Sequence, residues 1–277
     1  MVSLKDKVTL VTGGANGIGA NIVREFLKEG VKHIAILDID EGSGVALEKE
    51  INSNYGEGKS KFYKCDVTKD EELFAAYDKT METFGVIDVV VNNAGIACDL
   101  PNVYKKEINI NFTATVTSTF KALQLMRVDE GGKGGTIINI SSVAALGLYS
   151  PNVFVYAATK SAILHYSASI GVKEYYRFTN VRVITMCYGL TDTDIINEMQ
   201  CYDKLSTKTL NSNVAYLRNQ GQIQTGEAAA KGLVTAYENG KSGSVWLVDN
   251  SKTSEISNNI NEAFNVMSRI ISVDFTV

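Results

Sequence analysis

Histidine and cysteine are both scarce in this chain of 277 residues, which has 2 histidines and 4 cysteines. His33 and His165 are too few and too far apart in the sequence to build a zinc site, so we expect no metal and no metal-dependent mechanism. The cysteines, at positions 65, 98, 187 and 201, form neither a C-x-x-C pair nor a disulfide-like cluster. That pattern is typical of a reducing compartment.

Long apolar runs and long basic runs are absent as well. No stretch approaches the ~20 apolar residues of a membrane span. The first apolar run, VTLV, leads directly into TGG without the cleavage site of a signal peptide. The longest basic run is Lys105-Lys106 and the formal charge is -4, which argues against a nucleic-acid partner. We therefore expect a cytoplasmic protein with no membrane span and no nucleic-acid partner.

What the chain does contain is a regular alternation of β-branched runs with amphipathic helical segments. Several of the runs are apolar on both faces, which indicates parallel strands covered by helices on each side. No Pro-rich or Ser-rich linker divides the chain, so residues 1–277 are predicted to form a single domain. The prediction is an α/β, doubly wound fold whose parallel sheet has about seven strands with helices on both faces. The predicted strands are residues 8–13, 33–38, 61–67, 86–95, 135–142, 181–189 and 244–249.

Two segments depart from this alternation. Residues 190–224 are polar and contain no strand pattern, and they follow the sixth predicted strand, where a substrate lid would sit. The tail, residues 251–277, carries an apolar stripe that would pack on this lid or on a partner subunit. The stripe consists of Phe264, Val266, Met267, Ile270 and Ile271.

The first predicted strand ends in the glycine-rich turn TGGANGIG and an amphipathic helix follows it. Glycines in such a turn let the backbone approach a pyrophosphate, which then lies at the N-terminus of the helix. Asp38 ends the next strand, where an acid would accept hydrogen bonds from an adenosine ribose and repel a 2′-phosphate. A solvated loop acid or helix cap is the alternative for Asp38. The glycine turn contains no arginine or lysine to bind an extra phosphate, so we expect NAD rather than NADP.

Tyr156 precedes Lys160 by one helical turn in the segment VFVYAATKSAILHY. Residues with this spacing are neighbours on one face of a helix. Simple packing, with the tyrosine in the core and the lysine extended to water, would explain the pair. The alternative is catalysis, because an adjacent ammonium group favours ionisation of a phenol whose pKa is ordinarily ~10.

Four motifs in order, TGGANGIG, NNAG (92–95), a serine at the end of the fifth strand, and YAATK, resemble the short-chain dehydrogenase/reductase family. The resemblance covers residues 5 to about 250. The segments ININ, GTIINISS and SGSVWLVD are most similar to the insect-type alcohol dehydrogenases and 15-hydroxyprostaglandin dehydrogenases of that family. The resemblance implies a Rossmann fold, a homodimer or homotetramer, and NAD-dependent hydride transfer between nicotinamide and a secondary alcohol or ketone. A catalytically silent NAD-binding structural or storage protein remains the alternative.

The resemblance also implies roles for individual residues. Tyr156 would exchange a proton with the substrate oxygen, and Lys160 would bind the nicotinamide ribose. Ser142 would hydrogen-bond the substrate oxygen, with Ser141 as the competing serine. Asn111 would connect the lysine side of the site to water, with Asn109 as a nearby rival. The cofactor would be held by Gly13, Asn16, Gly17, Ile18, Gly19, Asp38, Asp66, Val67, Asn93, Ala94, Gly95, Tyr156, Lys160, Gly189, Thr191 and Thr193. Thr193 in TDTD is also a candidate helix N-cap.

Tyr188 is a departure from the family pattern, which usually has Pro-Gly where this chain has Tyr188-Gly189. The tyrosine would line or narrow the pocket, donate a hydrogen bond, or be a tolerated loop substitution. The segments ALGLYSPNVF (145–154) and CYGL (187–190) are apolar and aromatic, which favours a lipid-like or terpenoid alcohol. The basic residues that could anchor a carboxylate in the predicted lid are Lys204, Lys208 and Arg218.

Overall fold

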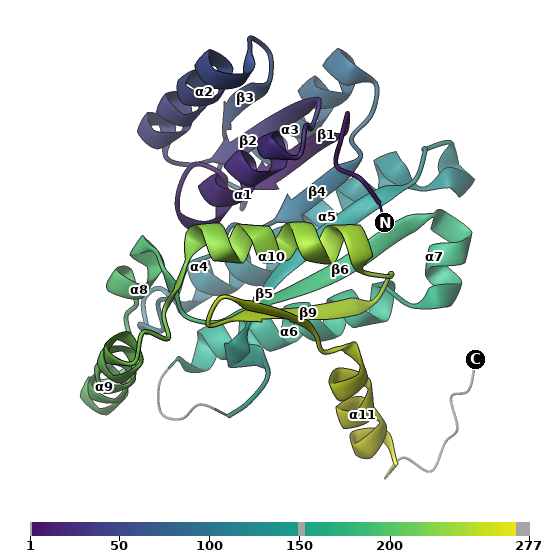
Figure 1. The fold of residues 1–277 in the computed structure, drawn as a ribbon. Helices are drawn as coiled ribbons and strands as arrows, with labels where there is room; N and C mark the ends of the chain where they lie inside the picture. Colours follow the sequence, from purple (N-terminus) through teal and green to yellow (C-terminus); the bar gives the residue numbers. More distant parts are fainter. Residues whose placement is uncertain (1, 149–152, 270–277) are drawn as a thin grey trace.

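A mostly parallel sheet forms the centre of the computed structural model, which describes residues 2–148 and 153–269 (Figure 1). Within these residues the sheet has eight strands in the order β10-β9-β6-β5-β4-β1-β2-β3. All neighbouring strands are parallel except β10, which is antiparallel to β9. The strands are β1 (Val8–Thr12), β2 (His33–Asp38), β3 (Ser60–Lys64), β4 (Val89–Asn92), β5 (Gly135–Ser142), β6 (Val181–Tyr188), β9 (Ser244–Asp249) and β10 (Lys252–Glu255).

Helices cover both faces of this sheet, as the predicted fold requires. One face packs against α1 (Gly17–Lys28), α2 (Glu41–Tyr55) and α10 (Gly226–Asn239), with Phe26, Ile36 and Leu233 in the shared core. The other packs against α3 (Asp70–Phe84), α5 (Ala114–Met126) and α6 (Phe154–Ile170). A short helix, α7 (Lys173–Thr179), leads from α6 into β6. The doubly wound α/β architecture is thereby confirmed.

The strand order reverses its direction beside β1. This strand lies between β2 and β4, and the chain crosses from one side to the other between β3 and β4. In doubly wound sheets the crevice at such a reversal, at the carboxyl ends of the strands, is where ligands bind. The glycine turn after β1 and the NNAG turn after β4 both lie at this place.

The prediction that residues 190–224 are strandless and irregular is wrong. The segment contains α8 (Asp194–Glu198) and α9 (Lys204–Asn219), with a small parallel pair formed by β7 (Thr191–Asp192) and β8 (Gln224–Thr225) at its two ends. Asp203 is the N-cap of α9, and its side chain accepts a hydrogen bond from Ser206 N at 2.8 Å. In Figure 1 this segment extends from the end of the sheet near α4 (Tyr104–Ile108).

Within the described residues the tail packs apolar side chains on the sheet and α6 and not on the 190–224 segment, and its packing on a partner subunit stays a prediction. It forms β10 and then α11 (Ser257–Ser268), and it contacts α6 and β9. Phe264 packs edge-to-face with His165 of α6, with ring centroids 5.3 Å apart, whereas Val266 and Met267 are exposed. The predicted stripe residues Ile270 and Ile271 lie outside the described residues. Among the helices of the described residues, none is both long enough and apolar enough to cross a membrane.

Candidate active site

The glycine turn between β1 and α1 is shaped by close backbone contacts. Gly13 and Gly17 have φ of +60° and +53°, a conformation that favours glycine. A Cβ on Gly13 would lie 2.8 Å from Ala94 Cα, and one on Gly19 would lie 2.7 Å from Asn93 Nδ2 and collide with Gly13 O. The turn is therefore pressed against the NNAG turn, and only glycine fits there.

The N-terminus of α1 is open to a ligand. Asn16 occupies the N-cap position, but its side chain donates to Asp40 Oδ2 at 2.9 Å and does not cap the helix. Ile18 in the first turn packs against the core. Uncapped amides at a helix N-terminus, together with the helix dipole, form a site suited to phosphate.

Asp38, Asp66 and Val67 meet at the carboxyl ends of β2 and β3. The Asp38 carboxylate accepts hydrogen bonds from Ala15 N of the glycine turn at 2.9 Å and from Asp40 N at 3.0 Å. Asp66 closes a tight turn by accepting from Thr68 N and Thr68 Oγ1, and Val67 is buried. The structure therefore places an acid beside the glycine turn, where the ribose of a dinucleotide would lie.

The NNAG turn is tied to the glycine turn by Thr12, a residue that the sequence reasoning missed. Thr12 Oγ1 accepts hydrogen bonds from Asn93 N at 3.0 Å and Ala94 N at 3.1 Å. Asn93 Nδ2 in turn donates to Thr12 O and Gly13 O. Gly95 follows within the same turn. A single threonine at a strand end has no distinctive pattern, so no sequence signal indicated this role.

Asn111 is buried in η1 (Asn109–Thr113), a single π-helical turn between α4 and α5. Its side chain pairs with both backbone groups of Ile96, at 2.9 Å each, and donates to Thr159 Oγ1 at 3.1 Å. The rival Asn109 is exposed. π-Helical turns of this kind occur frequently at functional sites.

Lys160 of α6 lies close to Asn111 and to the NNAG turn. It is 4% exposed, and its Nζ donates to Ile140 O at 3.0 Å. A Cβ built on Gly95 would lie 3.3 Å from Asn111 Oδ1 and 3.5 Å from Lys160 Nζ, so these residues meet. The packing alternative, in which the lysine extends to water, is wrong.

The two serines at the end of β5 have different surroundings. Ser141 Oγ donates to Lys160 O at 2.8 Å and is fully engaged within the core. Ser142 Oγ donates weakly to Tyr188 O at 3.4 Å and lies close enough to the Tyr156 phenol to lower its pKa. Ser142 is therefore the serine that the structure brings next to Tyr156.

Burial moves the pKa values of the tyrosine and lysine in opposite directions. Loss of water contact raises the pKa of Tyr156 to about 12, against the lowering effect of Ser142. Burial likewise lowers the pKa of Lys160 to about 8, while the nearby Glu107 opposes this shift. The Lys160 ammonium lies 5.6 Å from the centroid of the Tyr156 ring. Perturbed titratable groups that converge in this way are typical of catalytic sites.

Gly189, Thr191 and Thr193 follow β6 at the edge of this site. Gly189 N donates to Val248 O, and Thr191 is buried with its hydroxyl between Gly189 O and the Gln224 amide. Thr193 occupies the N-cap position of α8, but its hydroxyl donates to Thr191 O and does not cap the helix. A Cβ on Gly17 would lie 3.5 Å from Thr193 Cγ2, which places Thr193 against the glycine turn.

Tyr188 ends β6 and is not a loop residue. It is 4% exposed and packs with Met186 and Val248 on the face covered by α1 and α10, opposite the face covered by α6. Among the described residues its hydroxyl has no hydrogen-bond partner. The prediction of a loop substitution is therefore wrong, and no described residue accepts a hydrogen bond from the Tyr188 hydroxyl. That Tyr188 lines or narrows a pocket beside the nicotinamide stays a prediction.

A second feature missed by the sequence reasoning is a buried polar chain beneath the site. Asn92 Nδ2 donates to Asn139 Oδ1 at 2.8 Å, and Asn139 Nδ2 donates to Ser167 Oγ at 2.9 Å. Ser118 Oγ donates to Asn92 Oδ1 at 2.6 Å and also pairs with the Tyr77 hydroxyl. This chain links β4 and β5 to α3, α5 and α6, and so holds α6, which carries Tyr156 and Lys160, in register with the sheet.

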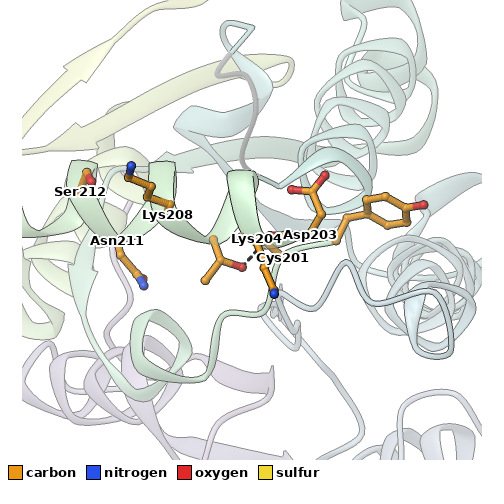
Figure 2. A pocket seen from close by; sticks show the side chains of 8 residues that line it. Cys201, Asp203, Lys204, Lys208, Asn211 and Ser212 are labelled. Atoms are coloured by element: carbon orange, nitrogen blue, oxygen red, sulfur yellow. Dashed lines mark hydrogen bonds between the residues drawn. The ribbon is translucent and has the colours of Figure 1, made fainter.

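A cavity of about 640 Å³ lies at the start of α9. Figure 2 shows its lining, which includes Lys204, Lys208 and Asn211 on successive turns of the helix. Cys201 lines the cavity and also belongs to an apolar cluster with Tyr156, Val153 and Leu210. The cavity is thus connected to the tyrosine through apolar side chains.

The fold and this site together are those of an oxidoreductase with a doubly wound, dinucleotide-binding architecture. The sequence model of the short chain dehydrogenase family matches residues 7–202. The chain belongs to the short-chain dehydrogenase/reductase family.

Individual relatives agree with this assignment. The chain is 32% identical to bovine (Bos taurus) 15-hydroxyprostaglandin dehydrogenase [NAD(+)] over 70% of its own length and 71% of the relative's. It is 34% identical to alcohol dehydrogenase 1 of Ceratitis cosyra, over 72% and 75% of the two lengths. A crystal structure of a short-chain dehydrogenase/reductase from Mycobacterium marinum superposes with a TM-score of 0.76 at 23% identity, covering 90% of this chain and 96% of the other. That likeness supports the fold.

Proposed function

We propose that this protein is an NAD-dependent dehydrogenase that interconverts a secondary alcohol and the matching ketone. The observation that carries the proposal is the convergence of Tyr156, Lys160, Ser142 and Asn111 beside an uncapped helix N-terminus. The alternative, a catalytically silent NAD-binding structural or storage protein, would also use the glycine turn. It would have no use for a tyrosine and a lysine with perturbed pKa values.

The cofactor would lie along the glycine turn, with its pyrophosphate at the N-terminus of α1 and its adenosine ribose at Asp38. The uncapped N-terminus of α1 and the Asp38 carboxylate beside the turn support this fit. The close packing of Gly13 and Gly19 against the NNAG turn holds the backbone in this shape. The carboxylate of Asp38 would repel a 2′-phosphate, so we propose NAD in preference to NADP. The hydride acceptor in alcohol oxidation is supplied by bound NAD.

The protein's own side chains would transfer the proton of the substrate hydroxyl group. Ser142 orients the substrate oxygen, and Tyr156 accepts the hydroxyl proton in oxidation or donates one in reduction. Because burial raises the pKa of Tyr156 to about 12, the free phenol is a proton donor at neutral pH. For oxidation it must ionise, and the Lys160 ammonium favours the ionised phenol. Asn111 holds the backbone at Ile96 and fixes the turn against which Lys160 lies.

The substrate would occupy the space between Tyr156 and α9. The apolar cluster of Val153, Cys201, Leu210, Met199 and Val214 supports a lipid-like or terpenoid alcohol. We further propose a homo-oligomer, since Phe120 of α5 is exposed and lies edge-to-face with Tyr166 of α6 on the outer surface. The four free cysteines support a cytoplasmic location.

The test is to follow NADH absorbance with purified protein, NAD and a panel of secondary alcohols, in parallel with NADP. Oxidation of at least one apolar secondary alcohol is expected, with catalytic efficiency favouring NAD by at least about tenfold, or ~1.4 kcal/mol. Tight binding of NAD without turnover on any panel member would favour the storage protein, and equal use of both cofactors would contradict the role of Asp38.

A further inference from the structure

The first turn of α6, which carries Tyr156, is held by an acid from a distant loop. Asp99 lies between β4 and α4, is 2% exposed, and accepts hydrogen bonds from Val155 N at 2.9 Å and Tyr156 N at 3.1 Å. The N-cap residue of the helix itself, Val153, offers no side-chain cap. Asp99 therefore does the work of an N-cap, and its charge complements the positive end of the helix dipole.

A second acid lies buried against the first. Glu107 of α4 is 0% exposed, and its Oε1 accepts a hydrogen bond from Cys98 N at 3.0 Å. Its Oε2 is buried with no partner that donates to it among the described residues. Two adjacent buried carboxyl groups cannot both be ionised without a large cost. A proton on Glu107 Oε2 removes this repulsion, and the resulting O–H can donate to the Asp99 carboxylate.

The surroundings of Glu107 support this assignment. Burial raises its pKa to about 7, the adjacent Asp99 adds to the increase, and Lys160 opposes it. The charged and titratable groups that face it are Asp99 from the loop and Tyr156 and Lys160 from α6. Lys105 and Lys106 on its own helix are exposed and point to water. A negative charge on Glu107 raises the pKa of Tyr156 and also that of Lys160.

We propose that Asp99 and Glu107 are positioning residues: Asp99 holds Tyr156 through the main chain of α6, and a proton on Glu107 keeps the pair singly charged. The role in turnover rests on the proposed function, whereas the shared proton does not. The same loop is joined to the 190–224 segment, because Asp99 N donates to Gln200 O at 2.8 Å and Gln200 N donates to Ala97 O at 3.2 Å. The acid pair therefore lies where the catalytic helix and this segment meet.

The first experiment measures the proton without any substrate. Infrared difference spectra of the wild-type protein across about pH 5 to 9 should show a protonated carboxyl band that disappears near about pH 7. The band should be missing in Glu107→Gln and present in Glu71→Gln, which changes an exposed carboxylate on α3 in the same way. A Glu107→Gln spectrum that keeps the band would overturn the proposal, even if no alcohol is ever oxidised.

The second experiment measures positioning. In Asp99→Asn only one of the two side-chain oxygens remains to accept the hydrogen bonds from Val155 N and Tyr156 N. Amide hydrogen exchange at these two residues should therefore become at least about tenfold faster. Glu107→Gln should keep the wild-type protection, since its amide donates to Asp99 as the protonated acid does, while Glu107→Ala should lose it. Equal exchange rates in all four proteins would contradict the positioning role.

The third experiment uses turnover. Glu107→Gln removes the charge that raises the pKa of Tyr156, so the rising limb of kcat against pH for alcohol oxidation should move to lower pH by about 0.5 units or more, roughly threefold in rate on that limb. KM for NAD should stay within about twofold. A profile that superposes on that of the wild type would exclude an effect of Glu107 on Tyr156.

Discussion

The glycine and NNAG turns, on one side of the site, are packed far more closely than helices α8 and α9 on the other. The glycine turn and the NNAG turn interlock through Thr12, Asn93 and close glycine packing. By contrast, α9 buries only Ser206 and Leu210 among its 16 residues, and α8 buries none within the described residues. The side that we propose for the cofactor is therefore formed without a ligand, whereas the side that we propose for the substrate is held by a few apolar contacts. We propose that residues 190–224 act as a lid for this reason.

The largest loss of turnover is expected at Tyr156, which lies between the glycine and NNAG turns and helices α8 and α9. Tyr156→Phe removes only the proton-transferring hydroxyl, so turnover should fall by roughly 10²- to 10⁴-fold, while NAD affinity measured by fluorescence titration should stay within about twofold. Tyr216→Phe makes the same change at an exposed position of α9 and serves as the control. A Tyr156→Phe protein with more than about a tenth of wild-type turnover would show that the hydroxyl is not essential.

The glycine turn, which packs against the NNAG turn, should tolerate almost no larger side chain in place of its glycines. Gly19→Ala forces a methyl group against Gly13 O and Asn93 Nδ2, so the turn must move and the dissociation constant for NAD should rise by at least about tenfold. Gly42→Ala in α2 is the matched control, because its Cβ would make only an ordinary contact at 3.5 Å with Asp40. Unchanged NAD affinity in a folded Gly19→Ala protein would argue that this turn does not hold the cofactor.

A smaller effect is expected on the pH dependence of the free energy of unfolding, through the buried Glu107. The pKa of Glu107 is raised from 4.5 to about 7 in the folded protein, so the folded state keeps a proton that the unfolded state has already lost. The contribution of Glu107 to stability should therefore be complete below about pH 4.5 and should be lost as pH rises toward about 7, by roughly 3 kcal/mol in total.

Denaturant unfolding across this range can measure the decline. Glu107→Gln should flatten it, and Glu71→Gln should leave it unchanged. An equal slope in the wild type and in Glu107→Gln would mean that another group titrates.

The smallest effect is expected on the sparsely packed side. Leu210→Ala weakens the contact of α9 with the Tyr156 cluster, so KM for the alcohol should rise by about threefold, with the dissociation constant for NAD unchanged. Leu205→Ala, at a 63% exposed position of the same helix, is the control.

Hydrogen exchange should separate the two sides directly. Amides of 190–224 should exchange faster than those of β1 and β4 in the free protein, and they should become protected when NAD and a substrate-like inhibitor bind. Protection that is the same with and without ligands would leave α8 and α9 as a fixed wall of the pocket and not a lid.

The buried parallel strands could be predicted from the sequence, whereas strand β10 at the sheet edge and the short strands and helices of 190–224 could not. The six interior parallel strands are apolar runs because both of their faces are buried, so they were recognisable. The seventh predicted strand, β3, lies at the sheet edge and shows the alternating burial of a strand with one exposed face. Strand β10 was missed because its four residues, KTSE, are nearly all polar and exposed at the sheet edge. The strands β7 and β8 have two residues each, too few for any period, and α9 carries a weak apolar stripe on a mostly polar helix.

The sequence by itself determined the seven main strands and their order along the chain, the glycine turn and the pairing of Tyr156 with Lys160, since each depends on residues within a turn or two of one another. Only the tertiary structure decided which groups surround that pair. Asp99 reaches the first turn of α6 across 56 positions of sequence, and Thr12 reaches Asn93 across 81. Such contacts depend on how strands β1, β4 and β5 lie side by side, and no local pattern of residues encodes that register. The same holds for Tyr188, whose place in the core on the α1 and α10 face follows from the position of β6 in the sheet.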